Sequence, residues 1–230
     1  MKTYTICLVG LEKQKAAVIG GGSVALRKVS GLREAGCQVT VISPELTGGL
    51  YDLQSSGQIH WVEKSYQPGD LRTLGLGPNS LVIAATDRPE INRQAWEEAL
   101  QLGCLINVAD DPEHSNFILP AVVRRGELTL AVSTGGASPA MARWLRQELE
   151  AQYGEEFGML ASVLGDLRPD LIAMFESEEE RRKAAFQIIE SGILDVIRRQ
   201  GEGPARAYAA SFLKNLQASH RNERDHRTGF

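Results

Sequence analysis

Apolar and polar positions follow two different rhythms in the first half of the chain. Short runs of aliphatic and β-branched residues, typical of buried strands, occur at 16–19, 38–42, 59–62, 81–85 and 105–108. Between them, the stretches 24–35 and 91–102 repeat apolar residues at helical spacing. Strands that alternate with helices predict a parallel sheet covered by helices on both faces. We therefore expect an α/β domain over residues 1–113.

The pattern changes after residue 113. Two strand-like runs, 117–123 and 128–132, are followed by a helix that we expect to start after Ser138, a good N-cap, and to end near Tyr153. Two strands are too few for a stable sheet, and pairing across a twofold axis would satisfy their edges. We therefore predict that residues 114–150 form a dimerisation segment and that the chain is a homodimer.

From residue 155 onward the pattern predicts only helices and turns. Ser177 and Glu180 form a candidate capping box, while Pro169 and Pro204 are expected to break helices. We assign residues 151–216 to a helical domain and the polar residues 217–230 to a flexible tail.

Composition narrows the function classes. The 230 residues are 43% hydrophobic and carry a net charge of −4, which favours a folded protein and argues against a nucleic-acid partner. No apolar run approaches the roughly 18 residues of a membrane span, and the N-terminus lacks the pattern of a signal peptide. Three cysteines without paired spacing, Cys7, Cys37 and Cys104, predict reduced core thiols in a cytoplasmic protein.

The glycine-rich sequence at 20–25 carries the first chemical signal. It has the form G-x-G-x-x-A, follows a predicted strand and opens a predicted helix. In a Rossmann-like domain Gly20 permits the tight turn, Gly22 lets a pyrophosphate approach the backbone, and Ala25 lets helix and strand pack closely. Ser23 and Val24 begin the helix, whose N-terminus attracts negative charge. This order predicts a dinucleotide site.

The end of the second strand indicates which dinucleotide binds. Ser43 occupies the strand tip, where an acid would bond the ribose 2′-hydroxyl of NAD, and Pro44 and Glu45 follow. No arginine stands there to hold a 2′-phosphate, so we expect NAD rather than NADP as the cofactor.

Four stretches together resemble a known family. They are the Gly20 loop running into Arg27-Lys28; Ala84-Ala85-Thr86-Asp87 with Asn92; 107–110 with 116–121; and Ala131 to Pro139, which includes Gly135-Gly136-Ala137-Ser138. In this combination the chain is similar to precorrin-2 dehydrogenase, the N-terminal module of sirohaem synthase. The likeness covers residues 1 to about 150. It implies an NAD domain, a small central dimerising segment and a helical C-terminal domain.

The resemblance also implies a reaction and its residues. Members pass a hydride from precorrin-2 to NAD⁺ with loss of protons, which yields sirohydrochlorin for sirohaem or corrinoid synthesis. The key aspartate of the family matches Asp110, which follows the fifth strand and is the expected acid or base. Asp111 is expected to be the turn residue beside it. The cofactor groove is expected to be lined by Thr86, Asp87, Asn107 and Val108.

The central segment departs from the family at one position. The phosphate-regulated serine of the family corresponds to Thr134 here, with Ser133 beside it, and the resemblance leaves open which of the two, if either, is regulatory. Thr134, Gly135 and Gly136 are expected to bind substrate carboxylates through backbone N–H groups. Basic residues that would face these carboxylates are Arg124, Arg125, Arg143 and Arg146.

Some alternatives stay open at this stage. Some family members also insert iron, and Asp110 with His114 would offer transient ligands, although no cluster predicts a permanently held metal. A non-catalytic NAD-binding regulatory module explains the glycine loop equally well. An NAD-dependent dehydrogenase of another small metabolite is a third interpretation.

Overall fold

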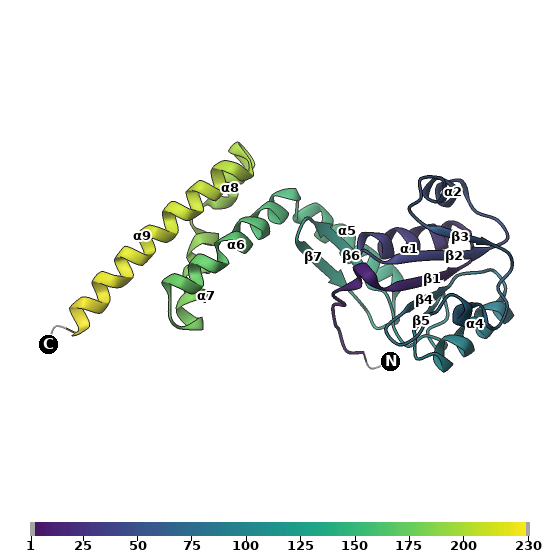
Figure 1. The fold of residues 1–230 in the computed structure, drawn as a ribbon. Helices are drawn as coiled ribbons and strands as arrows, with labels where there is room; N and C mark the ends of the chain where they lie inside the picture. Colours follow the sequence, from purple (N-terminus) through teal and green to yellow (C-terminus); the bar gives the residue numbers. More distant parts are fainter. Residues whose placement is uncertain (1–2, 229–230) are drawn as a thin grey trace. The chain divides into compact units, whose positions relative to one another are not determined.

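In the computed structural model, which describes the backbone of residues 3–228 and the side chains of residues 3–219, five parallel strands form one sheet. Their order is β3-β2-β1-β4-β5, and the strands are β1 (Lys15–Ile19), β2 (Gln38–Ser43), β3 (His60–Glu63), β4 (Leu81–Ala84) and β5 (Leu105–Val108). All neighbouring pairs are parallel. The expected Rossmann-like α/β fold is confirmed (Figure 1).

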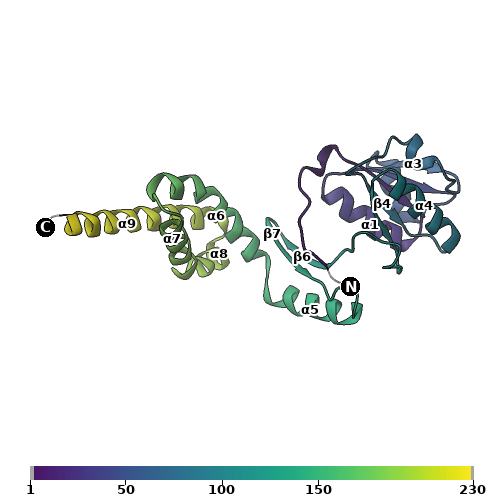
Figure 2. The same ribbon diagram turned by 90° about the horizontal axis from the view of Figure 1, so that it is seen from below.

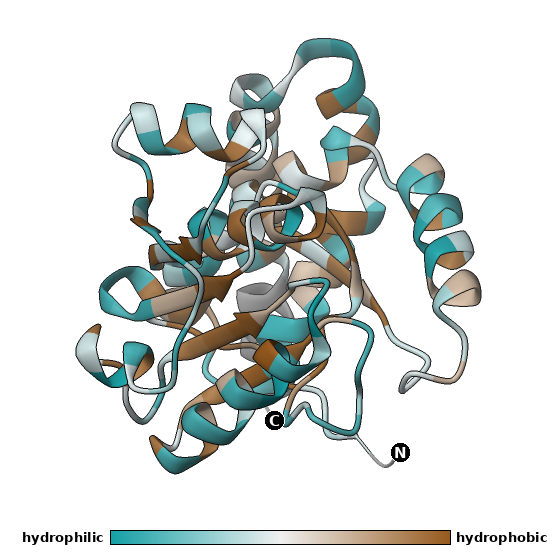
Figure 3. Ribbon diagram, turned by 90° about the vertical axis from the view of Figure 1, so that its right-hand side faces the viewer, coloured by the Kyte–Doolittle hydropathy of each residue, from teal (hydrophilic) through white to brown (hydrophobic). Residues whose placement is uncertain are grey.

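Alternate side chains of each strand are buried on opposite faces of this sheet. Val18 and Ile83 point to the face covered by α1 (Ser23–Glu34) and α2 (Gly48–Ser55). Ile19 and Ala84 point to the opposite face, which is covered by α3 (Asp70–Thr73) and α4 (Pro89–Gln101). A short 3₁₀ helix, η1 (Leu11–Lys13), precedes β1. Figure 3 shows apolar strands between helices whose outer sides are hydrophilic.

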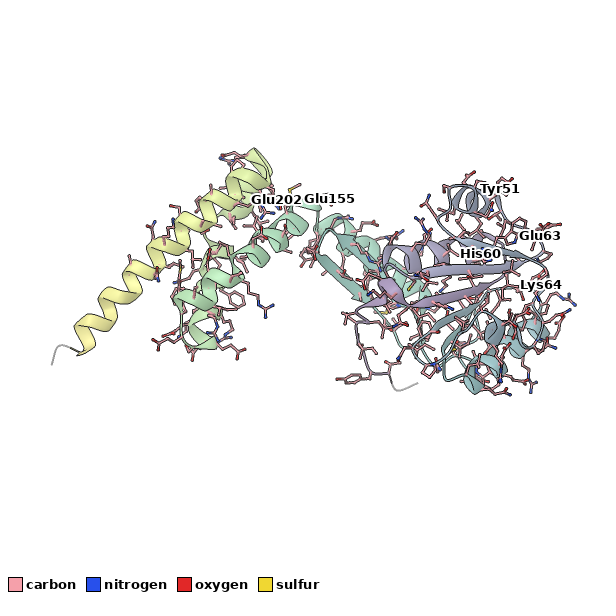
Figure 4. The ribbon with its side chains drawn as sticks, in the orientation of Figure 1. Tyr51, His60, Glu63, Lys64, Glu155 and Glu202 are labelled. Atoms are coloured by element: carbon pink, nitrogen blue, oxygen red, sulfur yellow. The ribbon has the colours of Figure 1, made fainter. Side chains whose placement is uncertain are left out.

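Strand β3 forms one edge of the sheet. Its side chains His60 and Glu63 are exposed, and so is Lys64 just beyond it (Figure 4). Charged residues on an edge strand disfavour pairing with the edge of another molecule. The helices α2 and α3 were not predicted, because α2 fully buries only Leu50 and α3 has four residues.

The chain divides into two compact units, Met1–Leu119 and Pro120–Phe230. The second unit starts with an antiparallel hairpin of β6 (Ala121–Arg125) and β7 (Leu128–Val132). Helix α5 (Pro139–Gln152) packs on this hairpin, and Ser138 caps it by accepting a hydrogen bond from the Met141 N–H (Figure 2). The expected start of the first strand at 117 is wrong, because residues before Ala121 turn back to bind β5.

The rest of the second unit is helical, as expected. Its helices are α6 (Glu155–Met174), α7 (Glu178–Glu190), α8 (Ile193–Gln200) and α9 (Glu202–Thr228), around a core that includes Val163, Ile188 and Leu213. The predicted capping box of Ser177 and Glu180 is present. Residues 217–228, expected as a flexible tail, are helical here, and 229–230 lie outside the described residues.

The two prolines that were expected to break helices behave differently. Pro169 does not break a helix but lies inside α6, where burial of Leu167 and Leu171 on both sides of it offsets the missing hydrogen bond. Pro204 does mark a boundary, since it lies in the first turn of α9.

The cysteines divide between core and surface. Cys37 and Cys104 are buried free thiols, whereas Cys7 is exposed, so its expected core position is wrong. Across residues 3–228, no helix combines the length and the apolar composition that crossing a membrane requires.

Candidate active site

The loops that leave β1, β4 and β5 are fixed to one another at the carboxyl edge of the sheet. The Ala85 N–H donates to the Ile19 carbonyl at 2.8 Å, and the Ala109 N–H donates to the Ala84 carbonyl at 2.8 Å. The Gly20 N–H reaches the Ile42 carbonyl of β2 at 2.9 Å. Sheets of this kind bind ligands just beyond the carboxyl ends of their strands, so this edge is the candidate site.

The three glycines after β1 have three different reasons to be glycine. Gly20 has φ +117°, and a Cβ there would lie 2.4 Å from the Ala85 carbonyl oxygen. At Gly21 a Cβ would lie 1.9 Å from the Glu45 carbonyl oxygen. At Gly22, by contrast, a Cβ would meet no atom within 4 Å. The first two glycines are required by packing, while the protein itself leaves the space beside Gly22 open.

This loop opens directly into α1. Gly22 is the N-cap of α1, and Ser23 and Val24 lie in the first turn. Because glycine has no side chain to cap the helix, the first N–H groups of α1 receive no side-chain capping bond. Ala25 is fully buried against the sheet, as the motif requires. The free N–H groups and the positive end of the helix fit a pyrophosphate.

The turn after β2 closes over the same loop. The Thr47 N–H donates to the Gly21 carbonyl at 2.9 Å, and the Ser43 hydroxyl donates to the Glu45 carbonyl at 2.7 Å. Pro44 and Glu45 are exposed at this edge. The buried hydroxyl oxygen of Thr47 has no hydrogen-bond partner among the described residues. An unpaired buried hydroxyl beside an open glycine cradle fits a site shaped for a polar dinucleotide.

The turn after β4 is held by Asn92. Its side-chain oxygen accepts from the Thr86 N–H at 3.1 Å and from the Thr86 hydroxyl at 2.7 Å, and its amide donates to the Thr86 carbonyl at 3.1 Å. The Thr86 hydroxyl also accepts from the Arg88 N–H. Thr86 therefore has its side chain engaged in the turn, so contact with a cofactor would come from its exposed neighbour Asp87 or from the backbone.

The segment after β5 folds back along that strand. Asn116 accepts from the Ile106 N–H at 2.8 Å, and Ser115 accepts from the Val108 N–H at 2.9 Å. The buried Asn107 amide donates to the Phe117 carbonyl at 3.1 Å. These side chains satisfy the open edge of β5. They also fix the turn that carries Asp110.

Asp110 differs from its neighbours in this turn. Its φ is +59°, a left-handed conformation that aspartate and asparagine tolerate better than most residues. The side chain is exposed and makes no hydrogen bond within residues 3–219. Its carboxylate is thus exposed at the carboxyl edge of the sheet.

Asp111 has the structural role expected for it. It accepts from the His114 N–H at 3.2 Å, and its Oδ2 lies 2.7 Å from the His114 Nδ1. Desolvation, which raises the pKa of Asp111, is outweighed by these hydrogen bonds, so that pKa is lowered. The His114 ring also packs edge-on against Trp96, with centroids 4.7 Å apart. His114 is therefore committed to closing the turn.

The predicted substrate loop lies in the second unit. The Thr134 hydroxyl accepts from the Ser138 N–H at 3.0 Å and donates to its carbonyl at 3.1 Å. Gly135 and Gly136 both have positive φ, +61° and +85°. A Cβ added at Gly136 would meet no atom within 4 Å. The loop is thus a preformed turn with a helix N-terminus after it.

The candidate arginines differ in whether their side chains already bind protein groups. Arg125 donates to the carbonyls of Tyr153 at 3.1 Å and Glu150 at 3.2 Å, and Arg146 pairs with the Glu150 carboxylate at 2.6 Å. Both hold the second unit together. Arg143 is exposed, which leaves it better placed for a ligand. Within residues 3–219, no three His, Cys, Asp or Glu side chains are grouped to hold a metal ion.

Comparison with known proteins adds to this geometry. A family model described as putative NAD(P)-binding matches residues 7–121, and a model of the sirohaem biosynthesis protein central segment matches residues 125–152. The chain belongs to this NAD(P)-binding family. The resemblance to the sirohaem synthase module is thereby confirmed.

The relatives share most of this chain. Siroheme synthase 1 of Aeromonas salmonicida is 40% identical over 173 residues, which cover 75% of this chain and 36% of that protein. Siroheme synthase of Chromobacterium violaceum is 36% identical over 197 residues, covering 86% and 41%. The chain thus spans less than half the length of these relatives. The solved structure named SirC, precorrin-2 dehydrogenase, has a TM-score of 0.67 at 24% identity, covers 94% of this chain and is itself covered completely. It has the same fold.

Sequence reasoning missed several residues of the candidate site. Gly21 was read only as the variable position of the motif, yet its packing against Glu45 fixes the loop. Asn92 and Asn116 were noted as parts of the resemblance, without the hydrogen bonds that explain them. A polar residue at a fixed distance after a strand is the signal that would have found them.

Proposed function

We propose that this chain oxidises precorrin-2 to sirohydrochlorin with NAD⁺ as the hydride acceptor. The single observation that carries this proposal is the presentation of Asp110. Its carboxylate is exposed and without a hydrogen bond in the described part of the chain, at the sheet edge where the glycine loop opens. The names of the siroheme synthase relatives and of the similar structure support the choice of substrate.

The roles of the residues follow from their positions. Gly20, Gly22 and the first turn of α1 would hold the pyrophosphate, and Pro44 and Glu45 would border the adenosine ribose. Asp87, Asn107 and Val108, with the backbone of Thr86, would border the nicotinamide side of the groove. NAD⁺, when bound, supplies the acceptor for one hydride. Asp110 would accept the proton that leaves the tetrapyrrole as the hydride departs.

The second unit carries the residues predicted to bind the carboxylates of the substrate and to form the dimer. We propose that Thr134, Gly135 and Gly136 bind substrate carboxylates through backbone N–H groups. We also propose a homodimer built mainly from residues 114–150, because the β6–β7 hairpin forms a sheet of two strands only, and pairing with a second copy would satisfy its outer edges. Static light scattering at micromolar concentration should give twice the chain mass, and a monomer mass would contradict this. The unpaired buried thiols support a cytoplasmic setting.

The proposed reaction is tested with purified precorrin-2. Addition of the chain and NAD⁺ should produce the absorption spectrum of sirohydrochlorin, and NADP⁺ should be the poorer acceptor. NAD binding without oxidation would favour a regulatory module instead. Oxidation of another metabolite alone would favour a different dehydrogenase. Iron or cobalt insertion into sirohydrochlorin, measured by absorbance without NAD, tests metal insertion separately.

The role of Asp110 is tested with Asp110→Asn. Asparagine tolerates the positive φ, so the turn should persist while the proton acceptor is lost. Turnover should fall by roughly a hundredfold or more, and NAD affinity should be unchanged. Asp52→Asn, an exposed carboxylate on α2, is the matched control and should keep full turnover. Wild-type turnover in Asp110→Asn would remove Asp110 from the mechanism.

A further inference from the structure

Lys28 is a charged residue of α1 to which the site described above gives no role. It lies in the second turn of α1, beside Val29 and three residues after Ala25, both of which are fully buried against the sheet. The lysine side chain is consequently half-buried at the margin of this packed face. Within residues 3–219 its ammonium forms no hydrogen bond or ion pair.

Topology brings Lys28 toward Asp110. Helix α1 starts at the carboxyl end of β1, and β4 lies between β1 and β5, whose exit turn carries Asp110. The Lys28 ammonium and the Asp110 carboxylate interact electrostatically, although they do not form an ion pair. The two groups therefore lie near each other at the carboxyl edge of the sheet.

The surroundings of the Lys28 ammonium do not fully compensate its positive charge. Burial is the largest influence and lowers the pKa of Lys28, Arg27 lowers it further, and the Asp110 carboxylate only partly restores it. An ammonium has three donors, and a half-buried one without partners loses hydration that no protein group replaces. An anion between Lys28 and the edge of the sheet would supply that missing partner.

We propose that Lys28 binds a carboxylate of the substrate and so holds the tetrapyrrole over Asp110. This inference rests on the proposed function and adds an anchoring point to it. The site would take a polycarboxylate ligand, one of whose arms pairs with Lys28 while the ring lies over the Asp110 turn. The same ammonium chemistry would suit a cofactor phosphate, since side chains on a helix lean toward its N-terminus. Experiments with substrate and cofactor separately distinguish these two sources.

The test compares Lys28→Met with Lys28→Arg in the full chain. Loss of one charge-assisted hydrogen bond, about 1.5–3 kcal/mol, corresponds to a rise of roughly 10- to 100-fold in the KM for precorrin-2. NAD affinity by calorimetry and the melting temperature should stay at their wild-type values. Lys28→Arg should recover most of the substrate affinity because it keeps the charge. Lys13→Met, an exposed lysine in η1, is the control and should change neither ligand.

A second readout does not depend on turnover. Uroporphyrin, an octacarboxylate tetrapyrrole, should bind the wild-type chain and bind Lys28→Met roughly tenfold or more weakly. If precorrin-2 is not oxidised but this difference is seen, the proposed reaction fails while the anchoring role stands. Weaker NAD binding with unchanged tetrapyrrole binding would assign Lys28 to the cofactor and overturn the proposal. Equal tetrapyrrole affinity in both proteins would also overturn it.

Discussion

Substitutions at Gly20 and Gly22 should separate packing from ligand binding within one loop. Gly22 has φ −85° and ψ −173°, an extended conformation that valine adopts readily, and its Cβ position is open to 4 Å. Gly22→Val should therefore change the free energy of unfolding by no more than about 0.5 kcal/mol. For a chain of this size that corresponds to a melting shift of roughly 2 °C or less.

The same substitution should remove NAD binding. The valine methyl groups would occupy the space above the first turn of α1, where the pyrophosphate must come within hydrogen-bond distance of the backbone. Loss of two hydrogen bonds to a charged group, at about 1.5–3 kcal/mol each, weakens binding by roughly a hundredfold to ten-thousandfold. Isothermal calorimetry with NAD, paired with thermal unfolding of the same samples, measures both quantities.

Gly20 should behave in the opposite way. A Cβ at this position meets the Ala85 carbonyl oxygen at 2.4 Å, and φ is +117°. Strained backbone alone costs about 1–3 kcal/mol, so Gly20→Ala should lower the melting temperature by roughly 5 °C or more once the clash is added. Gly31→Val, at another open position in α1, is the control and should retain both stability and NAD binding.

Two outcomes would refute this reasoning. Wild-type NAD affinity in Gly22→Val would mean that the cofactor does not approach this part of the backbone. A melting temperature for Gly22→Val as low as that of Gly20→Ala would mean that the space beside Gly22 is not open, and the loss of binding would then report unfolding.

The remaining predictions concern a buried hydrogen-bond network on the face of the sheet that α3 and α4 cover. Glu98 accepts from the Gly69 N–H at 2.9 Å, from the Arg72 N–H at 3.0 Å and from the Tyr66 hydroxyl, so Glu98→Ala should cost about 3–5 kcal/mol in urea unfolding. A loss under 1 kcal/mol would show that water replaces the carboxylate. Burial and the hydrogen bond to Glu98 raise the pKa of Tyr66. Because a raised pKa stabilises the folded state below the unfolded pKa near 10, stability should fall as pH rises above about 10. Tyr66→Phe should flatten this decline, and an unchanged slope would contradict the assignment.

The sheet could be predicted because its signals are local. Each strand is a short apolar run, and α1 and α4 repeat apolar residues at helical spacing, so element type follows from neighbours in the sequence. Pro169 shows where local signals fail. Its effect on a helix is set by the residues that α6 buries around it, and the sequence alone does not say which face will be covered.

The candidate site divides in the same way. Gly20, Gly22 and Ala25 were predictable because the motif itself states a geometry that one strand, one turn and one helix can satisfy. The hydrogen bonds of Thr86 and Asn107 were not, because their partners Asn92 and Phe117 are chosen by how the loops fold back. Whether a polar side chain is free for a ligand is thus a tertiary property.

The polar residues at the carboxyl edge of the sheet fall into two groups, those whose hydrogen-bond partners lie within the protein and those without such partners. Among the polar residues on which the resemblance was noted, Asn92, Asn116 and Thr86 complete turns or strand edges, and each has its partners within the protein. Asp110 and Lys28 do not, although a carboxylate and a half-buried ammonium gain much from a partner. A folded chain leaves a half-buried group such as the Lys28 ammonium unpaired at a cost in stability. That cost is recovered when a ligand binds, since the unpaired groups are already positioned and need not first give up bonds to the protein.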